Sequence, residues 1–247
     1  MEINRNKVLE TYKQRSKLNT VNSILGGSGD PISMHSDLYL DYFTKHFLLK
    51  SLNLKKDDIV LDFGCGIGRL STIVAKKAKQ VYGVDISEPL IKMSKNNLRP
   101  NIKYSCISNL QDIPLFVYNK IFTVGVLYHL NDIELIETLK FFGSVLHDNG
   151  YIVLIEHFSK TTNILDNIGK QRTKEDWIKA FSSSGLVIKK TFPIIRIPSY
   201  GLHIWKKSQP NRLFLSLLKI VEKLTMNYKV HNVSYFYQVV ILEKDNK

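Results

Sequence analysis

The feature that most constrains this chain is a glycine-rich loop between an apolar segment and a helix-like one. Gly64, Gly66 and Gly68 alternate with other residues shortly after the apolar run 59–61. Apolar residues close to helical spacing follow at Leu70, Ile73, Val74 and Ala78. This order predicts a buried parallel strand, a turn and a helix. Because glycine has no Cβ, the chain can turn tightly there and a ligand can approach its backbone.

The spacing of the glycines restricts the kind of ligand. A dinucleotide fingerprint needs a third glycine where Arg69 stands, and no Lys-Ser/Thr pair of a phosphate-binding loop follows. A second apolar segment, residues 81–85, ends in Asp85, which lies 21 residues after Gly64. An acid at this distance, at the tip of the next strand, is placed to accept hydrogen bonds from ribose hydroxyls.

An acid followed by Gly-x-Gly-x-Gly resembles motif I of the class I S-adenosylmethionine-dependent methyltransferases, and here Asp62 precedes Gly64-Cys65-Gly66-Ile67-Gly68. Three later segments resemble the same family. They are the adenine-binding loop at 109–114, in which Asn109 replaces the usual acid, the fourth strand and its Val-Leu-x-His-Leu segment at 120–130, and the turn into the fifth strand at 148–156. The resemblance covers most of residues 58–192.

This resemblance implies an α/β fold with a Rossmann-like, seven-stranded, mostly parallel sheet and helices on both faces. Residues 1–52 are expected to form an N-terminal helical cover and residues 53–247 the methyltransferase domain, effectively one domain. Residues 186–192 and 235–242 look like the antiparallel strands that finish the family's sheet. The segment 194–234 between them is an unusually long C-terminal insertion before the last antiparallel strand, and insertions of this size are commonly functional.

The resemblance also implies S-adenosyl-L-methionine as the cofactor, with no metal. In many small-molecule members of this family, N-terminal helices close over the cofactor, so Tyr12 and Arg15 are expected near its methionine carboxylate. The residues predicted to bind the cofactor are Asp62, Gly64, Cys65, Gly66, Gly68, Asp85, Ile86, Asn109, Leu110, Val124 and Gly125.

Catalytic candidates follow from the reaction. If the acceptor is a hydroxyl, a base has to take its proton, and ligands of open α/β sheets lie beyond the carboxyl ends of the strands. His129, Glu156 and His157 are the predicted candidates there, although His129 also fits a structural role. In the insertion, Tyr200, His203 and Trp205 can stack on a sugar or ring and hydrogen-bond to it, so we predict that they bind the substrate. His203 is an alternative base.

No sequence motif identifies the methyl acceptor. No Asn/Asp-Pro-Pro-Tyr segment follows the fourth strand, which argues against methylation of nucleic-acid bases. We therefore predict O- or N-methylation of a small molecule, with a saccharide or glycan precursor favoured. Two alternatives stay open: an RNA or protein methyltransferase, and a non-catalytic protein that binds S-adenosylmethionine.

Charge and composition bear on partners and location. The net charge is +13, but the lysines are scattered without a run of five, which is typical of a solvated surface and predicts no specific nucleic acid. A helix from about residue 210 to 226 has one apolar face, and Trp205-Lys206-Lys207 precedes it. Residues 205–226 are thus compatible with packing on the domain, a homodimer or peripheral membrane contact at a lipid-linked glycan. Two cysteines, a polar N-terminus and the lack of a long apolar run predict a cytoplasmic protein.

Overall fold

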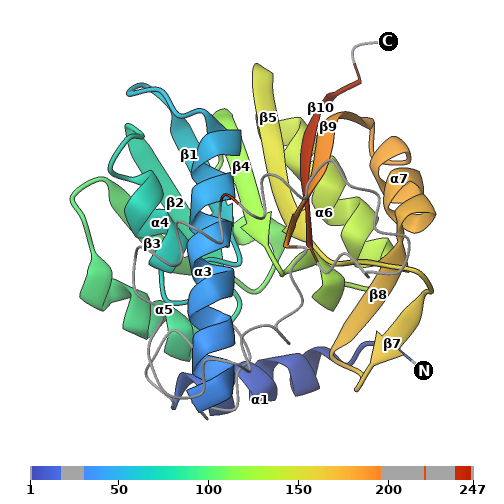
Figure 1. Cartoon of the computed structure of the whole chain (residues 1–247). Coiled ribbons are helices and arrows are strands. Elements are labelled where there is room, and N and C mark those ends of the chain that lie inside the picture. The colour runs from blue at the N-terminus through green and yellow to red at the C-terminus, as the bar shows by residue number, and fades with distance from the viewer. Residues whose placement is uncertain (1, 18–30, 196–219, 221–236, 246–247) are drawn as a thin grey trace.

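The computed structural model describes residues 2–17, 31–195, 220 and 237–245 (Figure 1). Its centre is a seven-stranded sheet in the order β3-β2-β1-β4-β5-β10-β9. β1 to β5 run parallel, and β10 is antiparallel to both of its neighbours. The strands are β1 (Ile59–Phe63), β2 (Gln80–Asp85), β3 (Ile102–Cys106), β4 (Tyr118–Val124), β5 (Leu146–Glu156), β9 (Leu186–Ile195) and β10 (Tyr237–Lys244). The predicted fold class is confirmed.

Helices cover both faces of the sheet because its central strands are apolar on both sides. On one face α3 (Pro31–Leu52) and α4 (Arg69–Val74) pack Leu48 and Val74 against Val60 of β1. On the other face α6 (Asp132–Val145) and α7 (Lys174–Ser182) belong to the core that contains Leu61. α5 (Glu88–Ser94) follows β2. Figure 1 shows α3 in front of the sheet, with α6 and α7 on its far side.

Helix α1 (Arg5–Ser16) lies across the carboxyl ends of the parallel strands (Figure 1). The Asn4 side chain caps the helix by accepting a hydrogen bond from the backbone N–H of Lys7. At one side the Asn4 backbone N–H donates to the Asn167 carbonyl (2.8 Å), and at the other the Arg5 guanidinium donates to the Ser108 carbonyl (2.5 Å). The helix therefore bridges the loop after β3 and the segment after β5.

A second sheet of three short strands, in the order β6-β8-β7, lies between β5 and α7 in the sequence. The strands are β6 (Phe158–Ser159), β7 (Asn163–Leu165) and β8 (Gly169–Thr173). Asp166 and Asn167 both have positive φ, 47° and 59°, in the tight turn that joins β7 to β8. Asp and Asn tolerate this conformation better than most residues. The sequence analysis did not predict this sheet.

Three short 3₁₀-helices complete the described fold: η1 (Lys95–Asn97), η2 (Leu110–Asp112) and η3 (Leu127–His129). η2 and η3 follow β3 and β4, so they lie at the carboxyl edge of the sheet. The predicted insertion falls almost wholly on residues outside the described ranges, and the division at residue 52 stays a prediction. Within the described part of the chain, no helix is long and apolar enough to cross a membrane.

Candidate cofactor and methyl-transfer site

The glycine loop after β1 needs glycine for two physical reasons. Gly64 has φ +76°, a left-handed conformation that L-residues rarely adopt. A Cβ at this position would also lie 2.3 Å from Cγ2 of Val126 and 2.8 Å from its Cγ1. The loop therefore brings bare backbone against the turn after β4, at the centre of the carboxyl edge.

The carboxylate of Asp85 joins this loop to the end of β2. Its Oδ2 accepts a hydrogen bond from the backbone N–H of Gly66, and its Oδ1 accepts one from Ser87, each at 2.8 Å. Burial raises the pKa of Asp85. Two backbone donors therefore fix this carboxylate at the border of a cavity.

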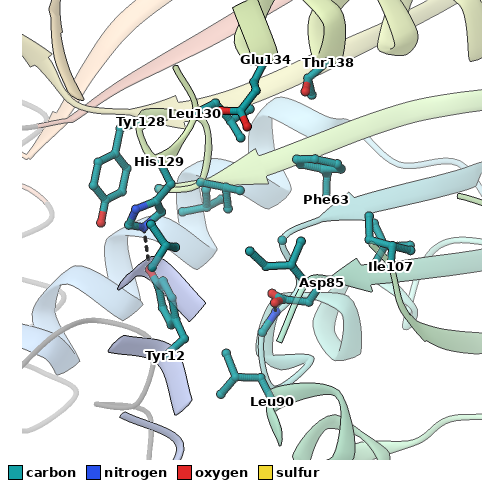
Figure 2. A pocket seen from close by; sticks show the side chains of 18 of the residues that line it. Tyr12, Phe63, Asp85, Leu90, Ile107, Tyr128, His129, Leu130, Glu134 and Thr138 are labelled. Atoms are coloured by element: carbon teal, nitrogen blue, oxygen red, sulfur yellow. Dashed lines mark hydrogen bonds between the residues drawn. The ribbon is translucent and has the colours of Figure 1, made fainter. Parts of the chain in front are cut away.

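The cavity has a volume of about 640 Å³ and lies between the glycine loop, α1, η2 and η3. Figure 2 shows Asp85 and Leu90 on one side of it and Tyr12, Tyr128 and His129 on another. The structure brings most of the predicted cofactor residues to its wall. They are Gly64, Gly66, Asp85, Ile86, Asn109, Leu110, Val124 and Gly125.

Three predicted cofactor residues, Asp62, Cys65 and Gly68, do not line the cavity. Asp62 accepts a hydrogen bond from the Ser71 hydroxyl, and burial raises its pKa to about 7. Gly68 is the N-cap of α4, and the Tyr104 hydroxyl donates to its carbonyl at 3.3 Å. Cys65 is buried. These residues therefore contribute to the conformation of the loop without lining the cavity.

A hydrogen-bonded chain of side chains borders the cavity near η3 (Figure 2). The Nδ1 atom of His129 contacts the carbonyl of Ile168, and because a carbonyl only accepts hydrogen bonds, we assign the proton to Nδ1. Nε2 then accepts the hydrogen bond from the Tyr12 hydroxyl, 2.8 Å away. Burial raises the pKa of Tyr12 to about 12 and lowers that of His129 to about 4. At neutral pH His129 is therefore an uncharged proton acceptor.

This pKa shift predicts a pH-dependent contribution to stability. Between pH 6.5, the ordinary value, and about 4, the unfolded chain binds a proton at His129 that the folded chain does not. The free energy of unfolding should therefore gain a component that falls as the pH is lowered through this window. Denaturant titrations at several pH values measure it, and the difference between wild type and His129→Gln isolates it from other titrating groups. Parallel pH curves for the two proteins would contradict the shift.

The other two predicted bases lie elsewhere. Glu156 is 1% exposed and does not line the cavity, and its Oε1 accepts hydrogen bonds from the backbone N–H groups of Val126 and Leu127. The ring of His157 packs edge-to-face on Tyr237, with centroids 6.2 Å apart, and burial lowers its pKa. Of the three candidates, His129 is the one at the cavity wall. Their catalytic roles stay predictions.

The predicted substrate-binding residues Tyr200, His203 and Trp205 lie outside the described residues. Arg69, in contrast, is a cavity residue that the sequence analysis treated only as the replacement of a glycine. One of its terminal nitrogens pairs with the Asp41 carboxylate, and its buried Nε has no hydrogen-bond partner among the described residues. A buried donor without a partner suits an anionic group such as an amino-acid carboxylate. Its position directly after the last loop glycine was the available signal.

Fold and site together define a class I S-adenosylmethionine-dependent methyltransferase. A sheet of this order, a glycine loop after β1 and an acid at the tip of β2 meet at one cavity. A model of the AdoMet dependent proline di-methyltransferase family matches residues 4–201, and the chain belongs to that family. S-adenosylmethionine is its cofactor. The unpartnered Nε of Arg69, the Asp85 carboxylate and the cavity volume fit this molecule.

Curated relatives match shorter parts of the chain. A probable cobalt-precorrin-6B C(15)-methyltransferase of Methanococcus maripaludis is 39% identical over 93 residues, which are 36% of this chain and 50% of the relative. An rRNA adenine N-6-methyltransferase of Streptococcus sanguinis is 33% identical over 119 residues, 47% of this chain and 46% of the relative. The chain thus spans about half the length of these relatives.

Two solved structures share the fold over almost the whole chain. A SAM-dependent methyltransferase of Leishmania major superposes with a TM-score of 0.68 at 17% identity, covering 96% of this chain and 82% of the other. Magnesium protoporphyrin IX methyltransferase of Synechocystis, solved with bound SAM, gives 0.62 at 17% identity, covering 97% and 94%.

The Asp85 assignment predicts a measurable loss of affinity. Asp85→Ala should weaken binding of S-adenosylmethionine and S-adenosylhomocysteine by roughly 1.5–3 kcal/mol, because a hydrogen bond to a charged acceptor is lost. Isothermal titration calorimetry measures both affinities. Asp85→Asn, which keeps an acceptor oxygen for Gly66, serves as the matched control and should lose less. Equal affinity in Asp85→Ala and wild type would remove Asp85 from the ribose site.

Proposed function

We propose that this protein transfers the methyl group of S-adenosylmethionine to an oxygen or nitrogen atom of a small-molecule acceptor held beside Tyr12, Tyr128 and His129. The observation that carries the proposal is the chain from Tyr12 through neutral His129 to the Ile168 carbonyl at the cavity wall. When bound, the cofactor supplies a methyl group on positively charged sulfur. The protein contributes orientation, exclusion of water and a route for the proton.

Each described residue has a defined task in this proposal. Asp85 would hold ribose hydroxyls. Arg69 would hold the methionine carboxylate in place of the Tyr12 and Arg15 expected from the sequence, although Arg15 also lines the cavity. The Tyr12 hydroxyl donates to Nε2 of His129 and presents its oxygen lone pairs to the acceptor. As the acceptor atom gains the methyl group, its proton passes to the Tyr12 oxygen and the proton of Tyr12 passes to Nε2, leaving a protonated His129 that solvent later neutralises.

The favoured acceptor class is a saccharide or glycan precursor, including a lipid-linked one. This choice depends on Tyr200, His203 and Trp205, whose side chains combine ring stacking with hydrogen bonding. A cytoplasmic location and the lack of a specific nucleic acid partner belong to the same proposal. Packing of residues 205–226 on the domain, a homodimer and peripheral membrane contact stay alternatives.

A second candidate acceptor is the nitrogen of a proline residue. The specific observation in its favour is the family description, since proline di-methylation is the reaction that it names. An amine acceptor has to be uncharged to attack, and an amine that still carries a proton after methylation can release it through the same Tyr12–His129 chain. The saccharide and proline proposals therefore differ in the acceptor, and both use the described site.

A label-transfer experiment separates the candidates. The protein is incubated with cofactor labelled in the methyl group and, separately, with nucleotide sugars, lipid-linked glycans, peptides that begin with proline, total RNA and a protein extract. Label in a sugar or glycan supports the first candidate, and label in the proline peptide supports the second. Heat-denatured protein is the control for enzyme-dependent label. Label confined to RNA would overturn both, and no transfer in any fraction would favour the non-catalytic alternative.

A further inference from the structure

Glu156 is a buried acid that lies away from the cavity, whereas a catalytic base has to reach the acceptor there. It ends β5, is 1% exposed and does not line the cavity. Its Oε1 accepts hydrogen bonds from the backbone N–H groups of Val126 (3.0 Å) and Leu127 (2.8 Å). A carboxylate without access to solvent is costly unless it is hydrogen-bonded, so its location requires a structural reason.

The reason lies in the short helix that Glu156 contacts. The two bonded N–H groups stand at the start of η3, where the helix itself supplies no acceptor. η3 carries Tyr128 and His129, and Val126 precedes it, so three side chains at the cavity wall depend on the placement of this one turn. Glu156 thus acts on His129 through the backbone, since Leu127 lies two residues before His129.

The β7–β8 hairpin also holds this segment. Arg172, 1% exposed on β8, donates to the Leu130 carbonyl (2.6 Å) and pairs with Asp132. A Cβ on Gly169 would lie 2.5 Å from the Tyr128 ring, so this ring packs directly on the hairpin backbone. The carbonyl of Ile168 accepts a hydrogen bond from the Nδ1–H group of His129. The segment 126–132 is therefore held by the Glu156 carboxylate, the Arg172 guanidinium and the backbone of the hairpin.

We propose that Glu156 is a positioning residue, which with Arg172 fixes η3 so that His129 presents Nε2 to Tyr12 and the acceptor. The inference rests on the proposed function for its kinetic part, while its structural part concerns the protein without any ligand. In this role Glu156 accepts hydrogen bonds from the backbone and does not abstract a proton from the acceptor. The two roles differ in what an amide can do, since glutamine accepts N–H hydrogen bonds but takes no proton.

The test compares Glu156→Gln with Glu156→Ala. Glutamine retains an oxygen for Val126 and Leu127, so kcat should stay within about threefold of wild type. Alanine leaves both N–H groups buried without acceptors, and the displaced His129 should lower kcat by about 10²-fold, the order seen for misplacement near 1 Å. The KM for S-adenosylmethionine should change little in either variant. Glu175→Ala, an exposed glutamate in the first turn of α7, is the matched control.

A second readout uses the ligand-free protein. Long-range ¹H–¹⁵N spectra report which nitrogen of each histidine carries the proton, and His129→Gln identifies the His129 signal among the seven histidines. Wild type and Glu156→Gln should show the same Nδ1-protonated His129, and Glu156→Ala should shift or broaden that signal while calorimetry still detects cofactor binding.

The outcomes separate the two roles. Equal losses of kcat in the Gln and Ala variants with an unchanged His129 signal would assign proton abstraction to Glu156 and overturn the inference. An unchanged His129 signal and unchanged kcat in the Ala variant would overturn it as well. If wild type transfers no methyl group, the proposed function fails, and the spectra alone still decide whether Glu156 positions His129.

Discussion

Replacing His129 with glutamine should lower kcat by about 10²–10⁴-fold, the usual contribution of a positioned general base. Glutamine fills similar space, but the relay from the acceptor through Tyr12 loses its terminal proton acceptor. Affinity for S-adenosylmethionine should stay near wild type, because His129 lies at the Tyr12 side of the cavity and Asp85 at another (Figure 2). Steady-state kinetics on an acceptor found by label transfer, with calorimetry for the cofactor, measure the two effects.

Tyr12→Phe is the matched control for this result. It removes the hydroxyl that donates to Nε2 while keeping the ring, so it should reduce kcat without altering the placement of His129. Full activity in His129, Glu156 and His157 single variants alike would rule out proton abstraction by all three. His203, or an amine acceptor that requires only positioning, would then be the remaining explanation.

Gly64→Ala should lower both the free energy of unfolding and the affinity for S-adenosylmethionine. The left-handed backbone costs about 1–3 kcal/mol for a residue with a Cβ. The overlap with Val126 adds a further cost of about 1–3 kcal/mol, as overpacking does. Both Cγ atoms and the Cβ of Val126 lie within 3.1 Å of the added atom, and rotation about χ1 does not move the Cβ, so it cannot remove the whole overlap. We expect at least a tenfold loss of S-adenosylmethionine affinity, because the displaced backbone borders the cavity.

Gly185→Ala separates the two causes. Gly185 has φ +69°, close to that of Gly64, but a Cβ there would meet no atom within 4 Å. It follows α7, away from the cavity, so this variant should show the backbone strain alone and bind the cofactor normally. Chemical denaturation and calorimetry on both variants provide the comparison. Identical losses of stability would show that contact with Val126 adds nothing.

The resemblance to class I methyltransferases was sufficient for the seven-stranded sheet, and local signals were sufficient for the cofactor half of the site. The apolar runs, the glycine spacing and the distance to Asp85 all depend on residues close in sequence. The helix after the loop was wrong in length, because α4 ends at Val74 although apolar spacing continues to Ala78.

The reacting side of the site was less accessible to sequence reasoning because its contacts join distant segments. Tyr12 and His129 are 117 residues apart, and His129 meets Ile168 across a further 39. Periodicity carries no information on such pairs. The hairpin that supplies Ile168 did leave a signal, since Asp166-Asn167 is typical of a turn with two positive φ angles. Glu156 was recognised as a residue at a strand end, but only the fold shows that it faces backbone donors.

Helix α1 has a consequence for the exchange of cofactor and product. It borders the cavity, buries only Val8 fully and is tied down near its start by Asn4 and Arg5 and further along by Tyr12. Little apolar surface is lost when such a helix detaches, so its opening is an inexpensive local unfolding event. We expect the residence time of S-adenosylhomocysteine to follow this opening.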